Sequence, residues 1–181
     1  MGTTEAAVGG THPGWSDDVF QALLELDVRQ VAYVPDAGLV RLIEACRAQA
    51  SMTAVPLTSE EEGVALLAGA WLGGQRGVLL MQGSGIGNCV NMLSLTRTCR
   101  FPLLIVATMR GQAGEANPWQ VPMGRIAAPV LDLAGVAVSQ VIAEADAGKA
   151  VAEMGREVFS GPTAAAVLIA QKIIGVKEFE E

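Results

Sequence analysis

Three consecutive carboxylates at the start of an apolar helix are the first candidates for chemistry. Glu60, Glu61 and Glu62 precede Gly63–Leu72, a run made only of apolar residues and glycine. A helix that is apolar around its whole circumference lies in a core or an interface, so a carboxylate at its mouth is a candidate for proton transfer. A structural explanation competes with this one. Ser59 and Glu62 match a capping box, and glutamates suit the positive end of a helix dipole, so spacing alone favours capping.

A glycine-rich turn is the second candidate. Gly83-Ser84-Gly85-Ile86-Gly87-Asn88 follows the apolar strand Val78–Gln82 and opens a helix. Glycines let the backbone approach a ligand closely, and a helix N-terminus offers oriented N–H donors. The turn differs from the dinucleotide pattern G-x-G-x-x-G and from a Walker loop, so nucleotide binding is a weak alternative. A tight connection without a ligand fits the pattern equally well.

Cysteine and histidine are too few and too scattered for several other kinds of site. Cys46, Cys89 and Cys99 are odd in number and lie in apolar or helical contexts, which indicates buried free thiols in a reducing cytoplasm. His12 is the only histidine and falls in a predicted tail. We therefore expect no His/Cys metal cluster and no Ser–His–Asp site.

Alternating strand and helix patterns predict how these candidates are positioned. Strands are predicted at Gln30–Val34, Met52–Leu57, Gly77–Gln82, Pro102–Met109, Val136–Val141 and Thr163–Ala170. Helices are predicted at Trp15–Glu25, Gly38–Ala48, Glu60–Leu72, Ile86–Thr98, Gly124–Ala134 and Ala143–Phe159. This order predicts an α/β fold of three layers, a parallel sheet flanked by helices. We expect a single domain over residues 13–176, a flexible tail at 1–12 and a charged tail at 177–181, with Arg110–Pro122 as the longest loop.

The amino-acid composition limits the kinds of partner that this chain is expected to bind. Hydrophobic residues make up 51% and charged residues 17%, against about 25% charged in typical domains, which favours extensive subunit interfaces over an unusually apolar monomer. A net charge of −7, with one Tyr and four Phe, argues against nucleic-acid binding. No apolar run is long enough to span a membrane, and the N-terminus does not match a signal peptide. A cytoplasmic location follows as an expectation.

The order of the motifs resembles the thiamine-diphosphate-dependent decarboxylases that act on sulfopyruvate and phosphonopyruvate. The resemblance spans about Trp15 to Ile174. The stretches that carry it are Tyr33-Val34-Pro35-Asp36, Glu60-Glu61-Glu62-Gly63, Ala68-Gly69-Ala70-Trp71-Leu72, Met81-Gln82-Gly83-Ser84-Gly85-Ile86-Gly87-Asn88, Arg110-Gly111 and Gln120–Ile126. It implies the pyrimidine-binding domain of these enzymes, in which a glutamate on the helix after the second strand hydrogen-bonds the aminopyrimidine and promotes its imino tautomer.

The family's spacing around that glutamate favours Glu60. The pattern has a glycine nine residues after the catalytic glutamate and a small residue three after it, which match Gly69 and Gly63. Leu67 departs from the small residue expected at the seventh position. Glu61 therefore stays open as the alternative catalytic residue.

The resemblance also implies which residues line the site. It places the cofactor-binding group beside the glycine turn, at Gln82, Gly83, Ser84, Gly85 and Asn88. Substrate contacts are expected from the strand-end residues Asp36, Arg110 and Gln120. A guanidinium suits sulfonate, phosphonate or carboxylate oxygens, but Arg110 could equally form a loop ion pair with Glu115 or Asp132.

The sequence lacks the Gly-Asp-Gly motif through which these enzymes bind Mg²⁺ and diphosphate. We therefore expect a separate β subunit that binds both, in a hetero-oligomer of α2β2 or larger, and no metal bound by this chain. The expected reaction is decarboxylation of a small 2-oxoacid, with sulfopyruvate yielding sulfoacetaldehyde and CO2. Phosphonopyruvate, another 2-oxoacid, or a non-catalytic subunit with the same fold are the alternatives.

Overall fold

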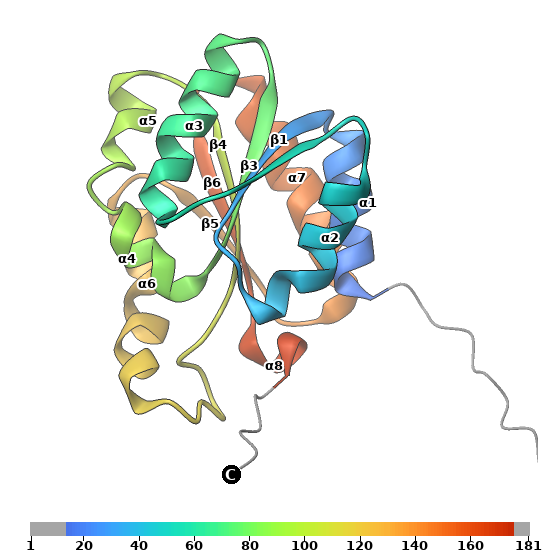
Figure 1. The fold of residues 1–181 in the computed structure, drawn as a ribbon. Helices are drawn as coiled ribbons and strands as arrows, with labels where there is room; N and C mark the ends of the chain where they lie inside the picture. The colour runs from blue at the N-terminus through green and yellow to red at the C-terminus, as the bar shows by residue number, and fades with distance from the viewer. Residues whose placement is uncertain (1–13, 176–181) are drawn as a thin grey trace, which may run out of the picture.

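The computed structural model describes residues 14–175, which form a six-stranded sheet with helices on both faces (Figure 1). All six strands are parallel and lie in the order β2-β1-β3-β4-β6-β5. Their bounds are β1 Val28–Tyr33, β2 Thr53–Pro56, β3 Arg76–Gln82, β4 Leu103–Thr108, β5 Ala137–Val141 and β6 Ala164–Ile169. The predicted α/β architecture is confirmed. The predicted tails 1–12 and 177–181, with His12, lie outside the described residues.

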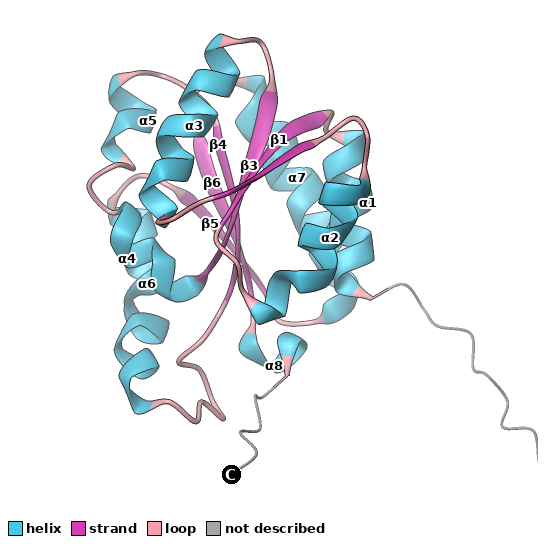
Figure 2. Ribbon diagram, viewed as in Figure 1, coloured by secondary structure: helices cyan, strands magenta, loops and turns pink. Residues whose placement is uncertain are grey.

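Helices cover the sheet in two layers, as predicted (Figure 2). One layer holds α1, α2 and α7, and the other holds α3, α4, α5 and α6. The bounds are α1 Trp15–Glu25, α2 Val40–Ala48, α3 Glu60–Leu72, α4 Ile86–Cys89, α5 Ser94–Thr98, α6 Val121–Leu133, α7 Ala147–Ser160 and α8 Gln171–Ile174. Neighbouring residues of a strand point to opposite faces, so β4 contributes Val106 to the core under α1, α2 and α7, and Ile105 to the core under α3 and α6.

The predicted helix Ile86–Thr98 is the clearest error in the secondary structure. The segment forms two short helices, α4 and α5, joined by a turn. In this turn the Asn91 carbonyl accepts a hydrogen bond from Ser94 Oγ at 2.8 Å, a side-chain interaction that competes with regular helix bonding. Smaller differences concern helix ends: α2 begins at Val40, α6 begins at Val121 and α7 begins at Ala147. Helix α8 was not predicted, because four residues show no periodicity.

Helix α3 is not buried on every side within this chain. Its first turns bury Glu60, Gly63, Val64 and Leu67 against the sheet, whereas Leu72 is 88% exposed. Exposed apolar side chains continue over the same helical layer, at Trp71, Leu72, Val90, Ile126 and Leu133. The expectation that α3 contributes to a subunit interface is consistent with this exposed face. No helix among residues 14–175 is long and apolar enough to cross a membrane.

The three cysteines differ in exposure, which corrects the prediction that all are buried. Cys46 and Cys89 are buried, but Cys99 is exposed at the end of α5. Burial raises the pKa of the Cys46 thiol to about 12. Burial, with a smaller effect from the nearby carboxylates of Glu60 and Glu61, raises the pKa of Cys89 to about 12.

Thiol labelling of the folded chain should therefore modify one position. We expect a maleimide near neutral pH to react with Cys99 and to spare Cys46 and Cys89 until denaturant is added, because the thiolate is the reactive form. Mass spectrometry of labelled peptides measures this directly, with Cys99→Ser as the control. Labelling of Cys89 in the native chain at the rate of Cys99 would contradict the described burial.

Candidate functional site

The carboxyl ends of the strands, at the lower edge of the sheet in Figure 1, bring the candidate residues together. The chain runs from β1 outward to β2, and then returns to place β3 on the other side of β1. Such a change of direction opens a crevice at the strand ends, where α/β sheets bind ligands. Asp36 follows β1 and Gln82 ends β3, so these two predicted site residues flank the crevice.

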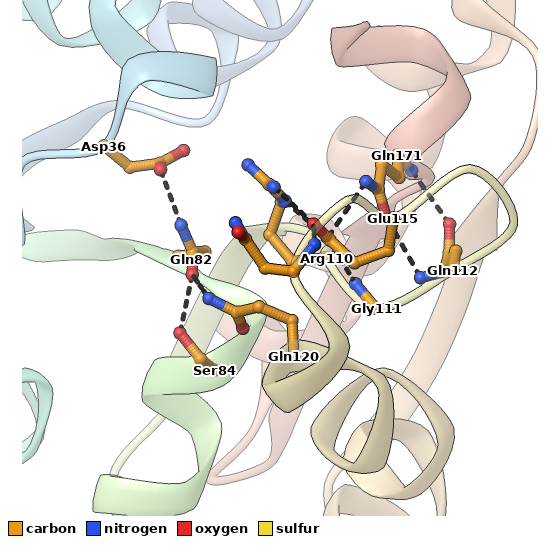
Figure 3. Close-up of polar contacts among 10 residues, drawn as sticks. Asp36, Gln82, Ser84, Arg110, Gly111, Gln112, Glu115, Gln120 and Gln171 are labelled. Atoms are coloured by element: carbon orange, nitrogen blue, oxygen red, sulfur yellow. Dashed lines mark hydrogen bonds and ion pairs between the residues drawn. The ribbon is translucent and has the colours of Figure 1, made fainter. Parts of the chain in front are cut away.

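Asp36 joins three strand ends through its carboxylate. Its Oδ1 accepts a hydrogen bond from Gln82 Nε2 at 2.9 Å (Figure 3). Its Oδ2 accepts from Thr108 Oγ1 at 2.9 Å and from the Gly38 backbone N–H at 3.0 Å. Both oxygens are thus engaged by donors of the same chain, which gives Asp36 the geometry of a residue that orients Gln82.

The Gln82 amide is oriented by this contact. With Nε2 donating to Asp36, Oε1 points away and accepts from Ser84 Oγ at 2.7 Å and from Gln120 Nε2 at 3.2 Å. The structure therefore gathers Asp36, Gln82, Ser84 and Gln120 into one network (Figure 3). Asp36, Gln82 and Gln120 come from the segment after β1, the end of β3 and the loop after β4, which is why spacing in the sequence does not reveal their contacts.

Glu60 is a buried carboxyl group at the first position of α3. Its side chain lies over Gly85, where a Cβ atom would overlap the carboxyl group. Asn88 Nδ2 donates to Glu60 Oε2 at 2.7 Å, so the glutamate and the end of the glycine turn are linked. Glu60 is 8% exposed, and its Oε1 accepts no hydrogen bond from any described residue. Since no fully buried side-chain oxygen in residues 14–175 lacks a partner, Oε1 is not fully shielded from solvent.

The two neighbouring glutamates are engaged differently. Ser59 Oγ donates to the Glu61 carboxylate, and this hydrogen bond is the main reason why the pKa of Glu61 lies below its ordinary value. Glu62 Oε2 accepts from the Thr58 backbone N–H at 2.9 Å. The predicted capping box is therefore wrong, although Ser59 is the N-cap: its hydroxyl donates to Glu61 and makes no cap hydrogen bond. The ionised Glu61 carboxylate is the stronger acceptor, because a hydrogen bond from a hydroxyl to a charged group is charge-assisted.

The loop after β4 is organised around a buried ion pair that settles one of the alternatives. Arg110 pairs with Glu115, not with Asp132, through Nε–Oε2 at 2.8 Å and Nη2–Oε1 at 2.7 Å. This bidentate contact raises the pKa of Arg110, and it is the main reason why the pKa of Glu115 lies far below its ordinary value. The guanidinium keeps Nη1 free of Glu115.

Several residues that hydrogen-bond to the predicted site residues or to the loop after β4 were missed or given a lesser role in the sequence analysis. Glu115 appeared only as a possible partner of Arg110, and Thr108, Gln112 and Gln171 did not appear. A charged residue inside a loop rich in glycine and proline was the available signal for Glu115. Neutral side chains at strand ends carry no comparable signal, because their roles depend on contacts between distant segments.

A family profile described as "Thiamine pyrophosphate enzyme, N-terminal TPP binding domain" matches residues 15–126. The chain belongs to this family. The matched span runs from α1 into α6 and includes the Asp36 network, Glu60, the glycine turn and the Arg110–Glu115 pair.

Curated relatives align with most of this chain, but they differ in how much of their own length is covered. Sulfopyruvate decarboxylase subunit alpha of Methanococcus maripaludis is 38% identical over 111 residues, which are 61% of this chain and 66% of the relative. The subunit of the same name from Methanothermobacter thermautotrophicus is 32% identical over 77% of this chain and 85% of the relative. Phosphonopyruvate decarboxylase of Streptomyces viridochromogenes is 40% identical over 64% of this chain, but only 30% of that longer protein is covered.

A solved structure supports the fold. The 2-oxoglutarate:ferredoxin oxidoreductase from Magnetococcus marinus superposes with a TM-score of 0.71 over 90% of this chain and 29% of that chain. The sequence identity is 13%, so this likeness concerns the arrangement of the sheet and helices alone.

The Glu60 region fits the ring that the family name implies. A buried carboxyl group with one oxygen fixed by Asn88 and the other open can hydrogen-bond a ring nitrogen. Gly85 leaves the space that the Glu60 side chain occupies. These residues are thus suited to hold the aminopyrimidine of thiamine diphosphate.

Proposed function

We propose that this chain is the α subunit of a thiamine-diphosphate-dependent 2-oxoacid decarboxylase that converts sulfopyruvate to sulfoacetaldehyde and CO2. The observation that supports this proposal most strongly is the position of the Glu60 carboxyl group. It is buried over Gly85 and hydrogen-bonded to Asn88, and its Oε1 is not fully shielded from solvent. The sequence similarity to sulfopyruvate decarboxylase alpha subunits supports the substrate and the division into subunits.

Glu60 is the residue of this chain that would exchange a proton with the cofactor. Asn88 donates to Oε2, which leaves Oε1 to face the aminopyrimidine and to share a proton with a ring nitrogen. Bound thiamine diphosphate would supply the electron sink that decarboxylation requires. Glu61, the alternative, is already engaged by Ser59.

The network at the strand ends would hold the substrate. Gln82 and Ser84 come from the end of β3 and the glycine turn, and Gln120 reaches them from the loop after β4. Arg110 is proposed to donate to the acid group of the substrate through Nη1, the nitrogen that does not face Glu115. Asp36 would act indirectly, because it fixes the Gln82 amide.

A separate β subunit is proposed to bind the diphosphate and Mg²⁺. The exposed apolar side chains of α3 to α6 offer a surface for it, since a partner that covers Leu72 and Leu133 removes apolar area from water. The groove between α5 and α6 belongs to the same surface and is lined by Val90, Ser94, Arg97, Thr98, Val130, Leu133 and Ala134. An α2β2 or larger assembly would follow.

Phosphonopyruvate is the second candidate substrate, because phosphonopyruvate decarboxylase of Streptomyces viridochromogenes is 40% identical in the aligned region. Sulfonate and phosphonate oxygens accept hydrogen bonds from similar donors, so the Arg110 and Gln82 network can bind either group.

The proposed function is tested by measuring CO2 release by this chain mixed with its β subunit, thiamine diphosphate and Mg²⁺. Sulfopyruvate, phosphonopyruvate and pyruvate are compared, with each chain alone as a control. Release that needs both chains and is fastest with sulfopyruvate is expected. No release from any 2-oxoacid by a folded complex would indicate a non-catalytic subunit.

Gly85→Ala tests the position of Glu60 without removing a functional group. The added Cβ must displace the Glu60 carboxyl, and a misplacement of about 1 Å can cost about 100-fold in rate. We expect a loss of that order in kcat of the complex. Gly161→Ala is the matched control, because no atom lies within 4 Å of a Cβ at Gly161. Full activity of Gly85→Ala would argue against the described contact.

A further inference from the structure

Glu115 is the most heavily engaged side chain of the loop after β4. Its carboxylate accepts hydrogen bonds from Arg110 Nε and Nη2, from the backbone N–H groups of Gly111 and Asn117, and from Gln171 Nε2, all within 2.7–3.0 Å. The side chain is 1% exposed. One carboxylate therefore holds the beginning and the middle of the loop and the first residue of α8.

The rest of the loop is held in the same arrangement. Gln112 and Gln171 are joined by two reciprocal contacts, from the Gln112 N–H to Gln171 Oε1 at 3.0 Å and from the Gln171 N–H to Gln112 Oε1 at 2.8 Å. Gly111 has a φ of +75°, and a Cβ there would overlap the Gln120 carbonyl. The loop therefore folds back on itself and delivers Gln120 to Gln82 (Figure 3).

The contact with Glu115 determines which guanidinium nitrogen of Arg110 can bind a ligand. Nε and Nη2 are bound to Glu115, so Nη1 is the nitrogen that remains. The guanidinium extends toward Asp36, whose charge also contributes to the raised pKa of Arg110 (Figure 3). Because Glu115 neutralises the charge of Arg110, the arginine would select a ligand by a directed hydrogen bond more than by net charge.

We propose that Glu115 is a positioning residue for substrate selection and acts through Arg110. It fixes the guanidinium so that Nη1 donates to the second acid group of the 2-oxoacid, the group that sulfopyruvate has and pyruvate lacks. This inference rests on the proposed decarboxylase function. The predicted readout is the ratio of kcat/KM for sulfopyruvate to kcat/KM for pyruvate in the reconstituted complex.

A double-mutant cycle tests the proposal. Arg110→Gln should lower the ratio about tenfold, the order expected from loss of one charge-assisted hydrogen bond. Glu115→Gln should lower it by a similar factor, because the freed guanidinium leaves its place. The double variant should also lose only about tenfold, since the two residues act as one unit. Glu153→Gln, which alters an exposed ion pair with Lys149, is the matched control and should leave the ratio unchanged.

Two results would overturn the proposal. A ratio that is unchanged in Glu115→Gln, or effects of the two changes that multiply to about 100-fold, would mean that Glu115 only stabilises the loop. If Glu115→Gln does not assemble, Glu115→Asp keeps the charge, shortens the side chain and should lower the ratio in the same direction. An unmodified complex that decarboxylates neither substrate would instead refute the proposed function, so the two failures are distinguishable.

Discussion

Glu60→Gln is expected to lower kcat of the reconstituted complex by roughly 10²–10⁴-fold, the range that a positioned acid–base group contributes. The amide keeps the size of the side chain and can still accept a hydrogen bond from Asn88, but it cannot share a proton with a ring nitrogen. Steady-state kinetics of CO2 release measure the loss. Near-native Tm values for the variant complex would show that chemistry and not folding is affected.

Glu61→Gln is the control at the adjacent position, and its kcat should stay within about threefold of that of the unmodified complex, as expected for a surface substitution. The Glu61 carboxylate is engaged by Ser59 at the mouth of α3, whereas Asn88 donates to Glu60. A large loss in Glu61→Gln together with an active Glu60→Gln would reverse the assignment of the two glutamates.

Glu115→Gln is expected to lower the free energy of unfolding by about 3–5 kcal/mol near neutral pH, the usual cost of leaving one partner of a buried ion pair alone. The pKa of Glu115 is lower in the folded chain than its ordinary value of 4.5. The ionised carboxylate therefore stabilises the fold at pH values above 4.5. As the pH falls below 4.5 toward the lowered folded pKa, this contribution is lost. The difference between the two proteins should therefore shrink in acid.

Urea denaturation at a series of pH values from neutral to below 4.5 measures this difference. The double change Arg110→Gln with Glu115→Gln should be less destabilised than Glu115→Gln alone, because no unpaired buried charge remains. A loss that stays constant in acid would show that the stabilisation does not come from the ionised carboxylate.

Local patterns predicted the layers of the fold and the position of Glu60 in it. The apolar runs of β4 and β6 are those of strands buried on both faces, and the predicted bounds of α1 and α3 are those observed. The break between α4 and α5 was missed because Ser94 competes for the Asn91 carbonyl by a contact of its side chain, which apolar spacing does not report.

Contacts between distant segments account for what the sequence did not reveal in the site. Gln171 follows the last strand, yet it donates to Glu115 in the loop after β4. Thr108 at the end of β4 donates to Asp36 after β1, although β3 lies between these two strands. The identity of the partner of Arg110 likewise depended on the folded loop, because Glu115 and Asp132 were both charged and nearby in the chain. The sequence showed that α3 is apolar around its whole circumference, but it did not show which side of the helix packs against the rest of this chain.

Exchange of the C2 hydrogen of thiamine diphosphate for deuterium is the most direct test of the claim that Glu60 of this chain activates a cofactor held jointly with the β subunit. The exchange rate is measured by NMR in the complex without substrate, with Glu60→Gln and Glu61→Gln beside the unmodified protein. We expect exchange well above that of the free cofactor in the unmodified and Glu61→Gln complexes, and a rate near that of the free cofactor in Glu60→Gln. Equal exchange in Glu60→Gln and the unmodified complex, with the cofactor bound in both, would show that Glu60 does not activate the cofactor.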